Sequence, residues 1–560
     1  MKRNLIFVLL FALIFTFVAC VRSNENADEV LPNNAELSAE AEPENVEETE
    51  AEFEIEAEPI SLIEPEIIEL DPNAISYETG YYGFTARGAG EVTRTNEVSR
   101  AGDYSLLRTG RTASWNGISL NVTDIAEPFG EYEFSLWVMP TNESGATTFQ
   151  LSVEFNLDGS QTFRHFNGPL ANVTARPGEW TQMRGFFPFF DFDTVSVYIE
   201  TDGAGATADF FIDDVIFRSV AVEYVLEDHL PRLFEVYEDY FLLGTAVIPR
   251  DMRDTRLEFI RHHFNTITAG DDMKPGALQP RRGVFNWDTA DAIAQETLDM
   301  GMNLIGHALV WHSQSPAWMN PPGISREDAI ANLENHVTEV VTRYRGQVLV
   351  WDVVNEAFPS SIPGGQMPNV WRNVLRETPW LEAIGPEFIE IAFRAAHAAD
   401  PDAILIYNDY NLDNPRKREA VFHMIQELLE NGVPIHGIGM QAHYNLRTNP
   451  QDVENSILRF AELGIHVSIT ELDITAQGAL GYDVMPERYE LEQAILYARL
   501  FNIFREHSDV IHRVTLWGLD DATSWRSDRF PLAFNRDLTA KLAFFAIIDP
   551  EGFLEEHAPN

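Results

Sequence analysis

The sequence is poor in cysteine and in basic residues, and each shortage excludes a class of protein. Its 560 residues contain one cysteine, Cys20, so no intramolecular disulfide can form in any compartment. Lysine and arginine number 39 against 88 aspartates and glutamates, which gives a formal net charge of -49. This balance argues against a nucleic-acid partner, because binding phosphates needs a basic face that releases counterions.

Residues 1–20, MKRNLIFVLLFALIFTFVAC, resemble an export signal and not part of a fold. Two basic residues precede an apolar run that ends at Ala19, and Cys20 follows directly. A cysteine at this point resembles the lipobox of bacterial lipoproteins, although Phe17 stands where that motif usually has leucine. The resemblance implies that Cys20 is acylated and that the protein is an exported, membrane-anchored cell-surface lipoprotein. Simple secretion after cleavage, or an uncleaved anchor, are the alternatives.

The next segment is acidic and contains no cation over most of its length. Residues 24–71 include 18 aspartates and glutamates and no lysine or arginine, with alanine, proline and asparagine making up much of the rest. Such a composition stays extended and solvated, because too little apolar surface is available to bury. We therefore predict a disordered linker over residues 21–74. It serves as a spacer or merely as a soluble tail.

Residues 75–220 show the pattern of an antiparallel jelly-roll sandwich. Short runs of alternating apolar and polar residues are separated by Gly, Asn, Asp and Pro, and no helical periodicity interrupts them. The clearest strand candidates are residues 132–139, 148–155, 194–200 and 208–217.

Residues 221–556 alternate strand-like runs with amphipathic helices, a pattern that predicts a parallel sheet. A helix starts at Ser325, whose side chain and that of Asp328 form a potential capping box, and it ends before Gly346. Eight strand candidates occur, at 241–247, 265–269, 304–310, 348–354, 403–408, 437–441, 467–471 and 513–518. Because eight parallel strands close a β/α barrel, the predicted fold class is α/β, a (β/α)8 TIM barrel.

In such barrels the functional side chains come from the carboxyl ends of the strands. Polar and aromatic residues follow seven of the eight predicted strands: Asp271, Lys274, His307, Trp311, His312, Asn355, Glu356, Asn408, Tyr410, Gln441, His443, Glu471, Asp473, Trp517 and Trp525. Their convergence on one rim predicts an active site there.

Glu356 and Glu471 end the fourth and seventh predicted strands. Two carboxylates across a cleft suit glycosidic bond cleavage, because one protonates the leaving oxygen and the other attacks the sugar or activates water. A separation of about 5 Å leads to retention and a wider gap to inversion, and the sequence leaves both open.

His443 and Asp473 lie near Glu471 in the expected barrel. A histidine between two carboxylates would orient a nucleophile and keep it ionised, whereas the acid partner needs less polar surroundings. His307 and His312 could bind a metal, but they lack the compact spacing of a zinc site, so no catalytic metal or cofactor is predicted. Trp311, Trp517 and Trp525 offer flat faces to sugar rings, with burial in the core as the alternative.

Six motifs in one order resemble glycoside hydrolase family 10, the endo-β-1,4-xylanases, over about residues 226–546. They are GHALVWHSQSPAW, VWDVVNEAF, YNDYN, GMQAHY, SITELDI and LWGLDDATSW. The resemblance implies a retaining double displacement with Glu356 as acid/base and Glu471 as nucleophile. It also implies supporting roles for Asn355, at the sugar 2-hydroxyl, and for His443 and Asp473. The implied substrate-binding residues are Lys274, His307, Trp311, Gln314, Tyr410, Gln441, Trp517 and Trp525.

One segment departs from the family pattern. The family's Glu-Asn-x-Met-Lys appears as Gly270-Asp271-Asp272-Met273-Lys274, so one carboxyl is lost and an amide has become an acid. The catalytic pair is untouched. The departure bears on hydrogen bonding to the second glycone sugar, and hence on chain length and decoration.

The sandwich region resembles carbohydrate-binding module family 22, a companion of these xylanases. The matching stretches are GRTASWNG, YEFSLWV, GEWTQM and FFIDDVIF. Trp115, Tyr198 and Glu200 are the predicted xylan contacts. The resemblance also implies a structural calcium ion, whose oxygen ligands spacing does not assign.

We therefore expect a monomeric surface endo-1,4-β-xylanase whose partners are xylan and xylo-oligosaccharides. A β-1,4-glucanase on the same barrel is a second interpretation. A non-catalytic glycan-binding protein is a third, and the presence of both glutamates argues against it.

Overall fold

The computed structural model describes residues 77–558, except for 78–79, 81–82, 158–159, 190–191, 203–205, 221, 365–367 and 480–483. The predictions made for residues 1–74, namely the export signal, the acylated Cys20 and the acidic linker, lie outside the described residues and stay predictions. Among the described residues, no helix combines the length and the apolar character needed to cross a bilayer.

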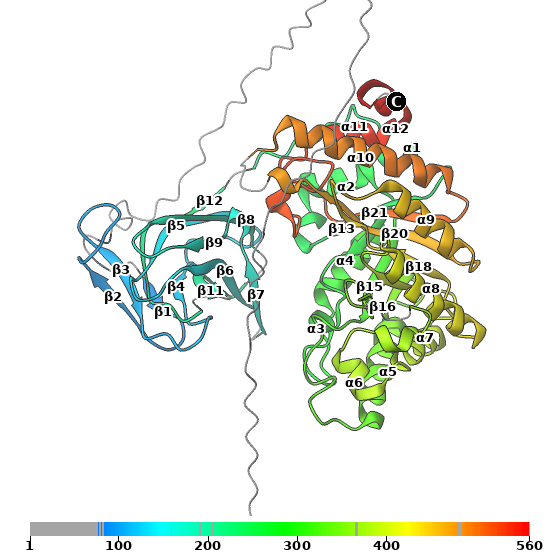
Figure 1. Ribbon diagram of the computed structural model, residues 1–560, viewed down its shortest axis with the longest axis horizontal. Helices are drawn as coiled ribbons and strands as arrows, with labels where there is room; N and C mark the ends of the chain where they lie inside the picture. Colours follow the sequence, from blue (N-terminus) through cyan, green and yellow to red (C-terminus); the bar gives the residue numbers. More distant parts are fainter. Residues whose placement is uncertain are drawn as a thin grey trace, which may run out of the picture. The chain divides into compact units, whose positions relative to one another are not determined.

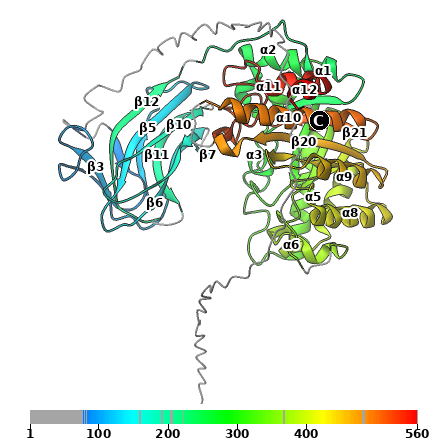
Figure 2. The same cartoon turned by 45° about the horizontal axis from the view of Figure 1, so that its top comes forward.

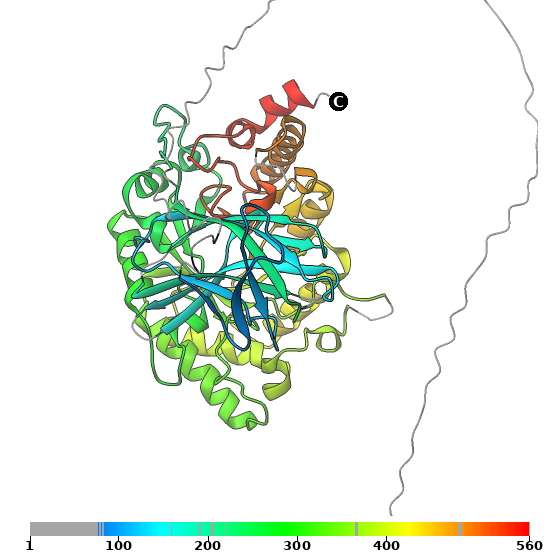
Figure 3. The same ribbon diagram turned by 90° about the vertical axis from the view of Figure 1, so that its left-hand side faces the viewer.

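The N-terminal part is a sandwich of two antiparallel sheets, as predicted (Figure 2 and Figure 3). One sheet runs in the order β1 (Phe84–Ala86), β4 (Ile118–Asn121), β11 (Thr194–Asp202), β6 (Thr147–Leu157) and β7 (Ser160–His165), and β9 (Asn172–Ala175) also pairs with β6. The other runs in the order β2 (Glu91–Thr95), β3 (Ser105–Thr109), β12 (Phe210–Ser219), β5 (Glu131–Pro140), β10 (Thr181–Pro188) and β8 (Asn167–Leu170).

Strand β6 shows why these residues form a sandwich. Leu151, Val153 and Phe155 alternate along the strand and are buried in the core between the sheets. The intervening Ser152 and Glu154 therefore lie on the opposite face of the same sheet. That face carries the module residues described below.

The C-terminal part is a closed barrel of eight parallel strands, which confirms the predicted fold (Figure 1). Neighbouring strands follow the order β18 (Gly437–Met440), β17 (Ile404–Asp409), β16 (Val348–Asn355), β15 (Asn303–Val310), β14 (Thr266–Ala269), β13 (Leu242–Val247), β21 (Ile511–Leu516) and β20 (His466–Thr475). Pairing of β18 with β20 closes the ring. A short extra strand, β19 (His443–Asn445), was not predicted and pairs with β20 beyond the end of β18.

Helices pack around the barrel and bury their apolar faces against the strands in one large core. They are α1 (Leu233–Val236), α2 (Asp254–His263), α3 (Pro275–Leu278), α4 (Asp288–Asp299), α5 (Arg326–Arg343), α6 (Pro379–Ile384), α7 (Phe388–Ala399), α8 (Pro415–Glu430), α9 (Pro450–Ala461), α10 (Glu487–Glu506), α11 (Leu542–Ile548) and α12 (Pro550–His557). Short 3-10 helices are η1 (Pro249–Met252), η2 (Trp371–Val374), η3 (Gln477–Ala479) and η4 (Ser527–Arg529). Helix α5 begins after Ser325, whose hydroxyl accepts from the Asp328 N–H, one half of the predicted capping box. The Asp328 carboxylate accepts from the Ser325 hydroxyl at 2.9 Å in place of the other half.

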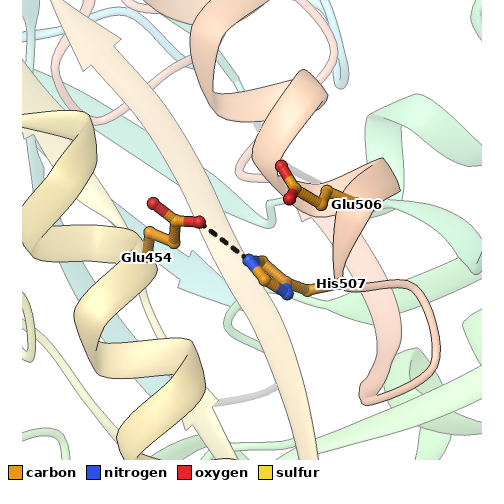
Figure 4. Close-up of side chains that lie close together, drawn as sticks. All are labelled: Glu454, Glu506 and His507. Carbon is orange, nitrogen blue, oxygen red and sulfur yellow. Dashed lines mark hydrogen bonds and ion pairs between the residues drawn. The ribbon is translucent and has the colours of Figure 1, made fainter.

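Two neighbouring helices of this outer layer are joined by a side-chain hydrogen bond. Glu454 of α9 and His507, which follows the last residue of α10, face each other with Oε1 and Nε2 3.0 Å apart (Figure 4). Glu506 lies beside this pair. The contact fixes α9 against α10, the helices that precede and follow β20.

Candidate active site

One cleft at the carboxyl ends of the barrel strands gathers nearly all the predicted site residues. The cleft is lined by Lys274, His307, Trp311, Gln314, Asn355, Glu356, Tyr410, Gln441, His443, Glu471, Trp517 and Trp525. Asp473 is fully buried and lies behind His443. The three tryptophans are not core residues, and Trp525 is 63% exposed.

Glu471 on β20 is buried among hydrogen-bond donors. Its Oε1 accepts from Asn408 Nδ2 at 2.7 Å, and its Oε2 lies 3.1 Å from His443 Nε2. Burial alone would raise its pKa, but the hydrogen bond from His443 and the nearby His307 outweigh burial and lower the pKa of Glu471 to about 2. The side chain is therefore a carboxylate throughout the neutral range.

His443 stands between two carboxylates, as predicted. Its Nδ1 lies 2.9 Å from Asp473 Oδ2, while its Nε2 contacts Glu471. Burial would lower the pKa of His443, but Asp473 and Glu471 overcome this effect and raise it to about 9. At neutral pH the ring is therefore an imidazolium that donates both N–H groups. Asp473 is held in turn by Trp525 Nε1 at 3.0 Å and by the guanidinium of Arg526.

Glu356 has different surroundings from Glu471. Its side chain is 14% exposed, against 5% for Glu471. Its closest donor is Gln441 Nε2, 3.2 Å from Oε1, while His312 Nδ1 and Arg376 Nη2 each lie 3.9 Å from Oε2. Burial, followed by the charge of Arg376, lowers the pKa of His312 to about 4, so this ring is neutral near pH 7. Glu356 thus lacks the imidazolium that holds Glu471 ionised.

Amide side chains connect the two glutamates. Asn355 Oδ1 accepts from Gln441 Nε2 at 3.1 Å and from Asn408 Nδ2 at 3.0 Å. The same two amide groups contact Glu356 and Glu471, respectively. This network occupies the oxygen of Asn355 and fixes which way its amide faces.

Strained backbone occurs at four residues of the cleft, among ten such non-glycine residues in the part of the chain that the structure describes. Gln314, Glu356, Asn411 and Ala442 all have left-handed backbone conformations, with φ of 46°, 58°, 53° and 64°. Residues other than glycine adopt this region at a cost, and such residues collect at functional sites because the surrounding structure over-determines them.

The segment that departs from the family pattern forms an ion pair. Lys274 Nζ lies 2.8 Å from Asp271 Oδ1 and 5.1 Å from the centre of the Trp311 ring. Although burial opposes it, the Lys274 ammonium lowers the pKa of Asp271 to about 2. Lys274 therefore reaches the cleft already partnered by a carboxylate.

Some residues at the site were missed by the sequence analysis. Asn408 was placed on the rim as the end of a strand, but no role was assigned to it. His312 was placed on the rim and considered as a metal ligand, but no role beside Glu356 was assigned to it. Arg376 and Arg526 lie in loops, where no strand end or periodicity marks them. Only contacts between distant segments reveal them.

The outward face of one module sheet brings together the three residues predicted there. Trp115 is 52% exposed, Glu200 Oε1 accepts from Ser152 Oγ at 2.7 Å, and Tyr198 is buried. The guanidinium of Arg87 covers Tyr198, 4.1 Å from its ring centre, and also pairs with Glu154 at 3.3 Å. Tyr198 therefore supports Arg87 and does not present its ring. Phe163, 44% exposed and not predicted, adds a second accessible aromatic ring on this face.

The module also contains a buried carboxylate, Asp213, that is held by backbone N–H groups. Asp213 on β12 is fully buried and accepts from the backbone N–H groups of Arg100 at 2.7 Å, Ala101 at 3.2 Å and Asp214 at 2.9 Å. Burial raises the pKa of Asp213 to about 6. These hydrogen bonds tie β12 to the loop before β3 without assigning ligands to the predicted calcium ion. The calcium ion itself stays a prediction.

A cleft at the carboxyl rim of a closed (β/α)8 barrel, with two acidic side chains in unlike surroundings, is the arrangement used by barrel enzymes that cleave glycosidic bonds. Residues 232–550 match the sequence pattern of glycosyl hydrolase family 10, and the chain belongs to this family. Residues 74–206 match the pattern of a carbohydrate binding domain. That match does not distinguish module family 22.

Known proteins resemble this chain over most of its length. It is 36% identical over 502 residues to endo-1,4-beta-xylanase A of Thermoanaerobacterium saccharolyticum, covering 85% of this chain and 42% of that protein. It is 31% identical over 494 residues to exoglucanase XynX of Acetivibrio thermocellus, covering 84% and 44%. The chain thus spans less than half the length of these two relatives. The crystal structure of xylanase XynB from Paenibacillus barcinonensis with a conduramine derivative has a TM-score of 0.54 and 35% identity, covering 57% of this chain and 99% of that one.

The charge of His443 predicts a pH-dependent contribution to stability. Its folded-state pKa is raised, so the imidazolium stabilises the fold fully below the ordinary histidine value of 6.5, and this contribution is lost as the pH rises through about 9. The unfolding temperature of His443→Gln should therefore lie several degrees below that of the parent near pH 6, and the gap should narrow toward about pH 9.5. A gap that stays constant over this range would contradict the assignment.

Proposed function

We propose that this protein is an endo-1,4-β-xylanase that cleaves internal bonds of xylan with retention, using Glu356 as acid/base and Glu471 as nucleophile. The observation that carries the proposal is the unlike environment of two glutamates in one cleft. Donors on both oxygens hold Glu471 as a carboxylate, whereas Glu356 accepts only from amides, Gln441 at 3.2 Å and Asn355 at 3.5 Å, both on Oε1, and is more accessible. Glycosidic bond cleavage by two carboxyl groups requires this division of roles, and retention is proposed because it is general to the family to which the chain belongs.

In the first step Glu471 attacks C1 of the sugar. As the new bond to C1 forms, the glycosidic C1–O bond breaks, and the proton of Glu356 goes to the leaving oxygen. Glu356 then takes a proton from water, and the resulting hydroxyl displaces Glu471 from C1. His443 and Asp473 keep the nucleophile oriented and charged between turnovers.

The remaining cleft residues bind substrate in this proposal. Because the oxygen of Asn355 is occupied, its amide NH2 is the group directed to the 2-hydroxyl of the sugar being cleaved. Lys274, His307, Trp311 and Gln314 are assigned to the glycone side and Tyr410 to the leaving-group side. Gln441, Trp517 and Trp525 complete the substrate-binding set.

The sandwich module is proposed to bind xylan and to raise its concentration near the cleft. Trp115 and Phe163 offer exposed rings for stacking on sugars, beside the polar groups of Arg87, Glu154 and Glu200. Export and attachment to a membrane through Cys20 belong to the same proposal. Such an anchor would place the enzyme at the outer surface of the cell, within reach of polymeric xylan.

Product analysis tests the activity. On arabinoxylan and glucuronoxylan we expect rapid loss of viscosity and a mixture of xylo-oligosaccharides, as internal cleavage requires, with release from mixed-linkage glucan at least about tenfold lower. Strong action on glucan with little release from xylan would instead favour the β-1,4-glucanase that the exoglucanase relative makes the second candidate. No release from either polymer would indicate a glycan-binding protein.

Azide rescue tests the residue roles. Glu356→Ala should lower kcat/KM on xylan by about 10²–10⁴-fold, because proton transfer to the leaving group is lost. Azide should restore turnover of substrates with good leaving groups and give the β-glycosyl azide, since Glu471 still forms the covalent intermediate. Glu377→Ala, an exposed glutamate of the following loop, is the matched control and should behave as the parent. An α-azide product would show that the proposed roles of Glu356 and Glu471 are reversed.

Loss of an exposed module ring tests the sandwich. Trp115→Ala should weaken binding to insoluble xylan about tenfold, because a stacking surface is removed, while activity on short soluble xylo-oligosaccharides stays unchanged. Ile216→Ala is the control, since Ile216 is 38% exposed and belongs to β12 in the other sheet. Equal retention of the parent and Trp115→Ala in affinity electrophoresis with soluble xylan would place the binding face elsewhere.

A further inference from the structure

Arg376 contacts the acid/base candidate and the leaving-group side of the cleft at once. It lies in the loop between η2 and α6, and its side chain is 22% exposed. Its Nη2 donates to the Tyr410 hydroxyl at 2.7 Å and lies 3.9 Å from Glu356 Oε2.

The same arginine binds three consecutive backbone carbonyls that begin at Glu356. Its Nε donates to the Glu356 carbonyl at 3.1 Å, its backbone N–H to the Ala357 carbonyl at 2.8 Å, and its Nη2 to the Phe358 carbonyl at 2.9 Å. Carbonyls at the end of a buried strand need partners once the strand ladder stops, because an unpaired buried polar group is costly. Arg376 supplies all three.

These bonds act on a strained turn. Glu356 has a φ of 58°, a conformation that non-glycine residues hold only where their neighbours enforce it. On the amide side of the turn, the Glu356 N–H donates to the Asn408 carbonyl at 2.9 Å and the Ala357 N–H to the Tyr407 hydroxyl at 3.0 Å. The carbonyl side depends on Arg376.

Tyr407 belongs to a fixed group beneath the turn. Its hydroxyl donates to Asp409 Oδ2 at 2.6 Å, and Lys417 Nζ contacts Asp409 Oδ1 at 2.7 Å, with both charged side chains fully buried. Asp409 Oδ1 also accepts from the Tyr410 N–H at 2.9 Å. The turn therefore has a rigid support on one side and the partly accessible Arg376 on the other.

We propose that Arg376 is a positioning residue for acid/base catalysis. It holds the left-handed turn that orients the Glu356 carboxyl. Its hydrogen bond to the Tyr410 hydroxyl also connects this turn to the leaving-group side of the cleft. The inference rests on the proposed function and adds a residue that determines how well Glu356 delivers its proton. No bond to substrate is required of Arg376.

Leaving groups of different basicity separate this role from a structural one. Proton transfer from Glu356 accompanies C1–O cleavage when the departing oxygen is basic, as in phenyl β-xylobioside or xylan. Departure of 2,4-dinitrophenolate needs no proton. A misaimed carboxyl therefore slows the first substrates and spares the last.

The test compares kcat/KM of Arg376→Gln and the parent on 2,4-dinitrophenyl and phenyl β-xylobiosides. We expect a loss of about 10²-fold or more on the phenyl substrate and less than about fivefold on the dinitrophenyl substrate. Arg372→Gln is the matched control. Arg372 belongs to the neighbouring 3-10 helix and forms an ion pair with Glu427, with Nη2 and Oε1 2.6 Å apart, and this pair does not involve the turn. It should match the parent on both substrates.

Arg376→Lys separates hydrogen-bond geometry from charge. Lysine keeps the positive charge but cannot make the fork of bonds to Glu356, Phe358 and Tyr410, so the leaving-group dependence should persist. Full recovery in Arg376→Lys would overturn the proposal in favour of a charge effect. Equal losses on both substrates, or unchanged rates in Arg376→Gln, would overturn it as well, and the unfolding temperature of each variant identifies a loss caused by misfolding.

Glu356→Ala distinguishes failure of this inference from failure of the proposed function. That variant should show the same leaving-group dependence more steeply. If Glu356→Ala shows no leaving-group dependence, the assignment of Glu356 as acid/base is refuted, and with it the proposed function. If Glu356→Ala shows the dependence and Arg376→Gln does not, only the role of Arg376 is refuted.

Discussion

The backbone hydrogen bonds between β18 and β20 close the sheet, and the site depends on that closure. In an open sheet, β16 and β20 would be separated by the strands between them, and their ends would lie far apart. Once the ring is closed, every strand delivers its last residues to one rim. Glu356 and Glu471, 115 residues apart by subtraction (471 minus 356), then share a cleft with side chains from most of the other strands.

Closure brings the two acids together, and hydrogen bonding then makes them different. Glu471 has a donor on each oxygen, one of them an imidazolium, so it remains charged even though it is buried. Glu356 has two amide donors on one oxygen, and a neutral histidine and a guanidinium each lie 3.9 Å from the other oxygen. The amides of Asn408, Asn355 and Gln441 span the space between the two. The same carboxyl chemistry can thus serve two roles, because each role is set by neighbours and not by the glutamate itself.

The sequence predicted the fold and most of the cleft because both follow from local patterns. Apolar strands alternating with amphipathic helices identify a barrel, and the polar residue after each strand must then face the rim. The contacts of Arg376 could not be foreseen in this way, since they join a loop to the end of a strand 20 residues earlier by subtraction (376 minus 356). The burial of Tyr198 was equally hidden. It was predicted as a xylan contact, which implies exposure, and only packing shows that Arg87 covers it.

The left-handed backbone residues at the rim lower the stability of the fold while they shape the active-site cleft. Each such residue costs about 1–3 kcal/mol relative to a relaxed backbone, and glycine would recover part of that energy. Glycine substitutions selected for heat resistance would therefore be expected at Gln314, Glu356, Asn411 and Ala442, which surround the cleft. Engineers who want a more durable enzyme have freer choice among the helices outside the barrel, where side chains can be changed without touching the strained rim.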